Sequence, residues 1–136
     1  MPYENMKSLY NSSDVFLNPT EAEAFSLPCA EAMACKKPVI TTNFGGMTDF
    51  ITESNGWLID GELHEVKNEV IYEGISWKRP NLTSLRKTMR EAQSNPELCR
   101  VKAENAYKSI LGWTWSNSSL KCQEFLSLVG GGVPDT

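Results

Sequence analysis

Three short apolar runs, at residues 15–17, 39–42 and 56–59, are separated by polar stretches and by Gly or Pro residues. Each run is rich in β-branched or aromatic residues and has the length of a buried strand. A row of good helix formers lies between the first two runs, begins near Pro28 and stops before Pro38. The order strand, helix, strand, loop, strand predicts an α/β fold with a parallel sheet flanked by helices.

Amphipathic helices are predicted before and after these strands in the sequence. One precedes the first strand over residues 6–10, where apolar side chains recur at helical spacing. Three more follow in the second half of the chain. Two of them begin at the potential caps Asn81 and Asn95, and the last begins after residues 113–115.

The sequence predicts a single domain. It has 136 residues, and no linker rich in Gly, Pro or Ser divides it before the three consecutive glycines at 130–132. We therefore predict a single domain over residues 1–129 and a short disordered tail over 130–136. Within this domain, residues 69–72 are either an edge strand or part of a lid over the sheet ends.

The predicted sheet is incomplete. Open α/β sheets have about five or six strands, and only three are predicted here. If the first strand is a middle strand of a larger sheet, its outer edge is left unpaired. Such an edge favours self-association or pairing with a partner chain.

Composition excludes several function classes. The 13 basic and 17 acidic residues give a net charge of −4 and alternate along the chain, so no basic surface for nucleic acid is predicted. No apolar window reaches the length of a membrane span, and no signal peptide is apparent, which predicts a cytoplasmic protein whose membrane contacts, if any, lie in other segments. Four cysteines without a Cys-x-x-Cys pair and one histidine predict no metal site.

Two glutamates flank the turn between the first strand and the helix that follows it. Glu23 lies in the loop, and Glu31 lies about one turn into the helix. In a parallel sheet, ligands bind outside the carboxyl ends of the strands, where a helix start offers free N–H groups to an anion. Because a carboxylate can accept hydrogen bonds from two vicinal hydroxyls, this pattern predicts a nucleotide-sugar site. Ser26 is expected to cap the helix with its side chain.

At these residues the chain resembles the retaining glycosyltransferases of family 4. These enzymes have the GT-B fold of two facing Rossmann-like domains, with a Glu-x7-Glu motif in the C-terminal, donor-binding one. The resemblance continues through residues 37–40, Gly45-Gly46 and residues 56–59. It implies that the chain is the distal part of that domain, a partial Rossmann-like sheet. Ala24, Ser26 and Lys36 depart from the pattern, because the family often has glycine there.

The resemblance also implies roles for single residues. Glu23 would touch the donor sugar as the catalytic-site carboxylate, and Glu31 would hold the ribose hydroxyls of the nucleotide. Backbone N–H groups would meet sugar or phosphate oxygens at three positions, Phe25, Ser26 and Leu27. Gly45 and Gly46 form either an ordinary turn or a backbone site for ligand oxygens.

The predicted function is retaining transfer of a hexose from a nucleotide diphosphate sugar to a glycan, lipid or small-molecule acceptor, without a metal or other cofactor. The family's diphosphate-binding basic residues and acceptor domain lie upstream of a segment like this one, which implies weak donor binding and little turnover by these residues alone. A non-catalytic module or truncated copy that pairs with a partner chain is the alternative, and a sugar-nucleotide epimerase on the same fold is a third. Glu21 is interpreted as a solvated side chain, and the four tryptophans as packing residues.

Overall fold

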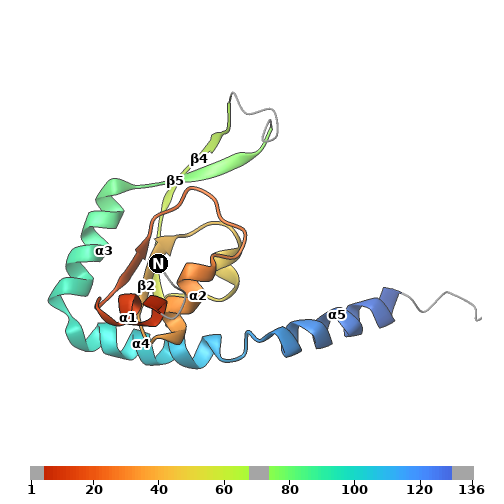
Figure 1. Cartoon of the computed structure of the whole chain (residues 1–136). Coiled ribbons are helices and arrows are strands. Elements are labelled where there is room, and N and C mark those ends of the chain that lie inside the picture. Colours follow the sequence, from red (N-terminus) through yellow and green to blue (C-terminus); the bar gives the residue numbers. More distant parts are fainter. Residues whose placement is uncertain (1–4, 68–73, 130–136) are drawn as a thin grey trace, which may run out of the picture.

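The computed structural model describes residues 5–67 and 74–129 and shows a small parallel sheet covered by helices (Figure 1). The sheet consists of β1 (Phe16–Asn18), β2 (Val39–Thr42) and β3 (Gly56–Ile59) in the order β1-β2-β3. Both pairings are parallel, with Phe16 opposite Val39 and Val39 opposite Gly56. The predicted α/β fold, with its parallel sheet flanked by helices, is confirmed.

The sheet is buried on both faces because successive β2 side chains enter two different cores. Val39 packs with buried residues of α2 (Leu27–Ala34), while Ile40 packs on the other face with Trp57 and Ile59. Helices α3 (Leu82–Ser94) and α4 (Pro96–Ile110) supply further side chains to that second face. The continuous apolar runs of the sequence follow from this two-sided burial.

The helix boundaries follow the local chemistry that the sequence shows. Side-chain oxygens of Asn81 and Asn95 accept hydrogen bonds from Ser84 N and Leu98 N at 2.9 and 3.0 Å, which confirms both as caps. Pro28 lies in the first turn of α2. After α2 the chain reverses at Lys36, whose φ of 56° is the left-handed conformation that glycine adopts more easily. The short helix α1 (Met6–Asn11) precedes β1.

An antiparallel hairpin follows the sheet. It pairs β4 (Gly61–Glu65) with β5 (Ser76–Pro80), in a stretch whose residue pattern predicts no clear element. Residues 69–72, interpreted above as an edge strand or a lid, lie outside the described residues, as does the predicted tail 130–136. A short 3-10 helix, η2 (Gly46–Asp49), lies between β2 and β3.

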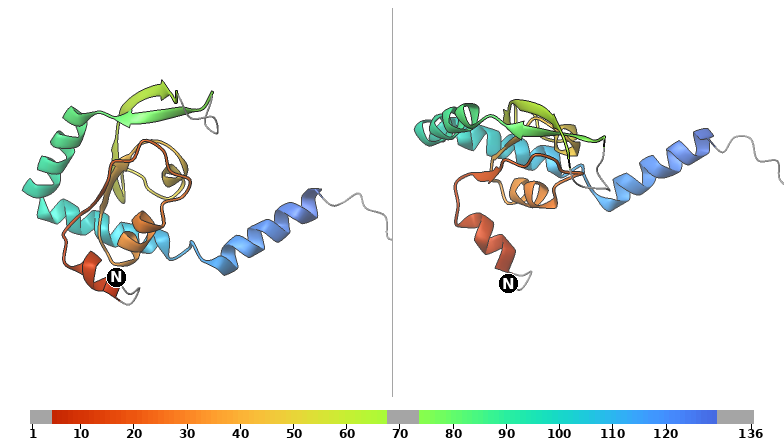
Figure 2. Two further views of the ribbon diagram at one scale, coloured as in Figure 1. Left: turned by 45° about the horizontal axis from the view of Figure 1, so that its top comes forward. Right: turned by 90° about the horizontal axis from the view of Figure 1, so that it is seen from above.

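The last helix, α5 (Trp115–Val129), projects away from the body of the protein (Figure 2). It has no buried residue, and Trp115 is 90% exposed. The expectation that the tryptophans are packing residues is therefore wrong for Trp115, although it holds for Trp57, which is 4% exposed. Within residues 5–67 and 74–129, no helix is both long and apolar enough to cross a membrane.

Lys102 of α4 is a buried cation that ties this helix to the sheet. Its Nζ donates to the backbone oxygens of Glu53 and of Gly56, the latter at 2.7 Å, and lies 4.8 Å from the centre of the Trp57 ring. Burial lowers the pKa of Lys102, and the charged partners around it only partly offset this. The ammonium thus donates to one carbonyl in the loop before β3 and to one in the first residue of that strand.

We expect Lys102→Met to lower the free energy of unfolding by about 2 kcal/mol, because the stem still packs on Trp57 while two carbonyl oxygens lose a charged donor. Chemical denaturation of the two proteins measures the difference. Lys108→Met on the exposed side of the same helix is the matched control, with an expected change within about 0.5 kcal/mol. Equal losses for both variants would contradict this role of Lys102.

Candidate functional site

Two loops meet backbone to backbone where β1 and β2 end. Gly46 N donates to Glu23 O at 3.3 Å. A Cβ atom at Gly46 would lie 1.7 Å from Ala24 O, and one at Gly45, where φ is 80°, would lie 2.5 Å from Glu23 O. No side chain fits between the loops, so the two glycines allow the loop that carries Glu23 to rest on the segment after β2.

Ser26 adopts an unusual conformation directly before α2. Its φ of 67° and ψ of 77° are left-handed, and its residue exposure is 3%. The prediction that the Ser26 side chain caps the helix is wrong: no such hydrogen bond forms, because a capping residue has extended backbone angles that aim its oxygen at the first turn. Here Ser26 Oγ instead accepts from Asn18 Nδ2 at 3.0 Å.

The turn at Ser26 leaves backbone donors unused at the start of α2. Among the described residues, no acceptor is found for the N–H groups of Phe25, Ser26 and Leu27. The Phe25 ring is held between Phe50 and Trp113, with ring centres 4.8 and 5.7 Å away, whereas the Leu27 side chain is exposed. Unpaired N–H groups at the start of a helix attract anions.

The two glutamates bracket this helix start in different environments. Glu23 is exposed, and its carboxylate has no hydrogen bond or ion pair with any described residue. Glu31 is half-buried, and its Oε2 accepts a hydrogen bond from Tyr10 Oη at 2.8 Å. Burial and this carboxylate raise the pKa of Tyr10, which stays a donor at neutral pH. Glu31 Oε1 has no partner among the described residues and can accept from a ligand hydroxyl.

Glu21 is not simply solvated, contrary to the expectation from the sequence. Its carboxylate lies 3.1 Å from both Arg79 Nε and His64 Nε2. Its backbone oxygen accepts from Lys78 N at 2.9 Å, and Lys78 Nζ in turn donates to Asn43 O at 3.2 Å. The β4–β5 hairpin therefore braces the loops after β1 and β2. The sequence could not show this, because it did not predict the hairpin.

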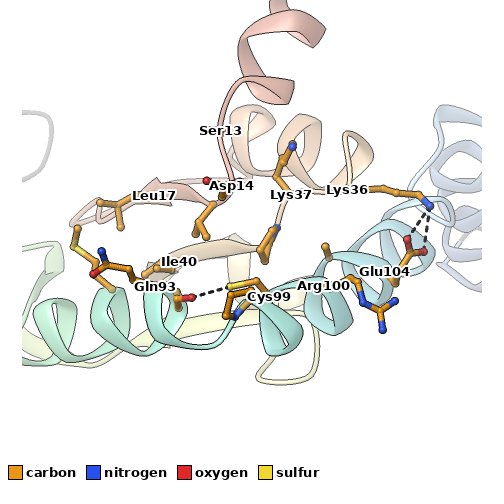
Figure 3. Close-up of a pocket in the computed structure, with 16 residues that line it drawn as sticks. Ser13, Asp14, Leu17, Lys36, Lys37, Ile40, Gln93, Cys99, Arg100 and Glu104 are labelled. Atoms are coloured by element: carbon orange, nitrogen blue, oxygen red, sulfur yellow. Dashed lines mark hydrogen bonds and ion pairs between the residues drawn. The ribbon is translucent and has the colours of Figure 1, made fainter.

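A groove lies elsewhere on the molecule, between the sheet and helices α3 and α4 (Figure 3). Its volume is about 950 Å³, and Leu17, Ile40 and Cys99 lie along its apolar part. Lys36 pairs with Glu104 at 2.9 Å on its rim. The groove includes residues that precede β1 and β2, so it lies towards the amino ends of the strands and is separate from the loop of Glu23.

A metal centre was not expected here. In the part of the chain that the structure describes, no three side chains of His, Cys, Asp or Glu are grouped so that they could hold a metal ion.

The sequence matches the family model for glycosyl transferases group 1 over residues 1–109. The chain belongs to this family. A similar relative is an uncharacterised glycosyltransferase of Methanocaldococcus jannaschii, 26% identical over 113 residues, which cover 83% of this chain and 27% of the relative. The chain thus spans about a quarter of that glycosyltransferase.

Solved structures of two glycosyltransferase-like proteins have the same fold. Sucrose-phosphate synthase from Thermosynechococcus elongatus matches with a TM-score of 0.71 at 20% identity, over 98% of this chain and 29% of the synthase. An Anabaena protein crystallised with UDP-glucose matches with a TM-score of 0.65 at 17% identity, over 93% and 30%. These likenesses confirm that this group 1 glycosyl transferase chain has part of a GT-B fold.

The glycine contact of this glycosyl transferase is testable by substitution. We expect Gly46→Ala to lower the free energy of unfolding by about 2 kcal/mol or more, because the new Cβ would overlap Ala24 O and force the loops apart. Thermal unfolding monitored by circular dichroism measures the loss. Gly112→Ala is the control, because its nearest neighbour would lie at an ordinary 3.7 Å. An unchanged stability of Gly46→Ala would show that the loops do not meet as described.

Proposed function

We propose that this chain is the donor-binding part of a glycosyltransferase that moves a hexose from a nucleotide diphosphate sugar with retention at the anomeric carbon, as in family 4. The observation that carries the proposal is the set of unpaired N–H groups at residues 25–27, which lies between two carboxylates at the carboxyl ends of a parallel sheet. The complex of the Anabaena protein with UDP-glucose supports a nucleotide sugar as the ligand class.

Each group has a role in this proposal. Glu31 Oε1 accepts from the ribose hydroxyls, while Tyr10 holds Oε2 and so fixes the carboxylate. The N–H groups of residues 25–27 donate to sugar or phosphate oxygens. Glu23, exposed and without a partner, contacts the sugar. The Gly46 N–H donates to Glu23 O and is therefore not available to a ligand. The Gly45 N–H has no acceptor among the described residues and can donate to a ligand oxygen.

The proposed chemistry uses no metal or other cofactor. The bond between the anomeric carbon and the diphosphate oxygen breaks, a bond to the acceptor oxygen forms on the same face, and the acceptor proton passes to the departing diphosphate oxygen. The protein then contributes positioning and stabilisation of the developing charge on the diphosphate. We also propose a cytoplasmic location for the protein.

Further parts of the fold complete the site. This chain covers 27% of the Methanocaldococcus jannaschii relative, 29% of the sucrose-phosphate synthase and 30% of the Anabaena protein, so the acceptor site and the basic groups for the diphosphate are proposed to come from other segments, in cis or in trans. In the described structure β1 pairs only with β2, which leaves its outer edge for such a segment or for a second copy. The same edge would serve the alternative function, a non-catalytic module that binds a partner chain.

Substitution of Glu31 tests the donor site. We expect Glu31→Gln to weaken UDP-glucose binding about tenfold or more, because a charged acceptor of ribose hydroxyls becomes a neutral one. Isothermal titration calorimetry with UDP-glucose and GDP-mannose measures this, and the loss should be the same for both because the ribose is shared. Glu124→Gln on α5 is the matched control. No binding of either ligand by the unmodified protein would overturn the proposal and favour the partner-binding module.

We also expect the 136-residue chain to bind UDP-glucose without measurable hexose transfer, because the acceptor site lies in other segments. Release of UDP in the presence of a panel of sugar and lipid acceptors is the measurement. The same assay with a full-length glycosyltransferase of this family and its own donor is the positive control. Transfer by the 136 residues alone would show that the site is complete without them.

A further inference from the structure

We infer that Asn18 is a positioning residue of the donor site, and that it holds the turn at Ser26 in the left-handed conformation on which the free N–H groups depend. This inference rests on the proposed function for its effect on binding. Its structural half is the claim that Asn18 and Ser26 are energetically coupled, and this claim is argued only from the contacts of Asn18 in the structure.

Asn18 is well placed to hold this turn because it is anchored on two strands. It is the last residue of β1 and is paired in register with Thr41 of β2. Its backbone oxygen accepts a hydrogen bond from Thr41 Oγ1 at 2.9 Å. The Thr41 residue is fully buried. The Asn18 side chain therefore projects from a fixed point at the carboxyl end of the sheet.

The two shorter contacts of the Asn18 amide nitrogen are with the start of α2. Nδ2 lies 3.0 Å from Ser26 Oγ and 3.4 Å from Cys29 Sγ, and a longer contact of 3.9 Å joins it to Met47 Sδ of η2. Ser26 and Cys29 are both buried, at 3% and 0% exposure, so water does not replace these contacts. One amide group thus joins β1 to the turn and to the first turn of the helix.

A serine at this position needs such support. A residue with a side chain is strained at φ 67°, whereas glycine adopts this conformation readily. The backbone angles of Ser26 also set the directions of the peptide planes on either side of it, and therefore of the N–H groups that we assign to the donor. If Ser26 relaxes to negative φ, the directions of these N–H groups change. Asn18 acts on the donor through Ser26, without touching it.

This arrangement makes a specific prediction that a general packing role does not make. If Asn18 only filled space, its replacement would have the same effect with serine or glycine at position 26. If Asn18 only satisfied the Ser26 hydroxyl, alanine at position 26 would relieve the loss as well as glycine does, because both remove that hydroxyl. If Asn18 holds Ser26 in its left-handed conformation, glycine at position 26 should make Asn18 dispensable and alanine, which keeps the strain, should not. The two substitutions are therefore expected to be strongly non-additive.

The test is a double-mutant cycle of Asn18→Leu and Ser26→Gly in the full chain, with UDP-glucose as the probe. We expect Asn18→Leu to raise the Kd about tenfold with serine at position 26 and by less than about threefold with glycine there, whatever Ser26→Gly alone does to the Kd. Ser26→Ala, which removes the hydroxyl but keeps the strained backbone, should not rescue Asn18→Leu. The free energies of unfolding without ligand should show the same pattern. Equal losses from Asn18→Leu in the serine and glycine backgrounds, no loss in either, or an equal rescue by alanine would overturn the inference.

Two further results keep the outcomes distinct. If Asn18→Leu fails to fold, Thr41→Val replaces it, because it removes the hydroxyl that anchors Asn18; a smaller loss that Ser26→Gly rescues is expected, and a loss without rescue overturns the inference. If the unmodified protein does not bind UDP-glucose, the proposed function fails. The unfolding cycle then decides the coupling of Asn18 with Ser26: its presence upholds the structural half, and its absence overturns it.

Discussion

The close approach of two backbone segments at the carboxyl end of the sheet is the constraint on which the candidate site depends. The loop after β1 can carry Glu23 to its place only because Gly45 and Gly46 present no side chain towards it. The β4–β5 hairpin contacts the same loop through ion pairs with Glu21. Asn18 contacts the end of the loop through its hydrogen bond to Ser26. Because three separate contacts hold one loop, the N–H groups at its end are already ordered before any ligand arrives.

The sheet and most helix boundaries could be predicted because each depends on local information. The runs at residues 39–42 and 56–59 consist mainly of β-branched and apolar residues and are buried, and Asn81 and Asn95 cap helices by contacts three residues away. The β4–β5 hairpin could not be predicted in the same way. Its exposed positions and charged side chains, such as Lys78 and Arg79, give no apolar alternation, and it is stabilised by contacts with loops distant in the sequence.

The motif of the site was visible in the sequence, but its supports were not. The positions of Glu23 and Glu31 follow from their spacing across the turn between the first strand and the helix after it. The Ser26 cap was predicted wrongly, because a serine before a helix is usually extended, whereas here its hydroxyl accepts from the half-buried Asn18 amide and its backbone is left-handed. The contact of Tyr10 with Glu31 joins residues 21 apart, and no local pattern signals it.

The two ends of the sheet differ in how closely they are packed. At the carboxyl ends, loops and hairpin enclose backbone donors in a tightly packed arrangement. Towards the amino ends, the outer edge of β1 and the groove beside Leu17 and Ile40 carry apolar surface, and α5 presents an entirely exposed face. Apolar surface of this extent is costly in water unless another segment covers it. The proposed donor site therefore lies on a sheet whose β1 edge is open to the proposed partner segment, and we expect the stability of the site to depend on that pairing.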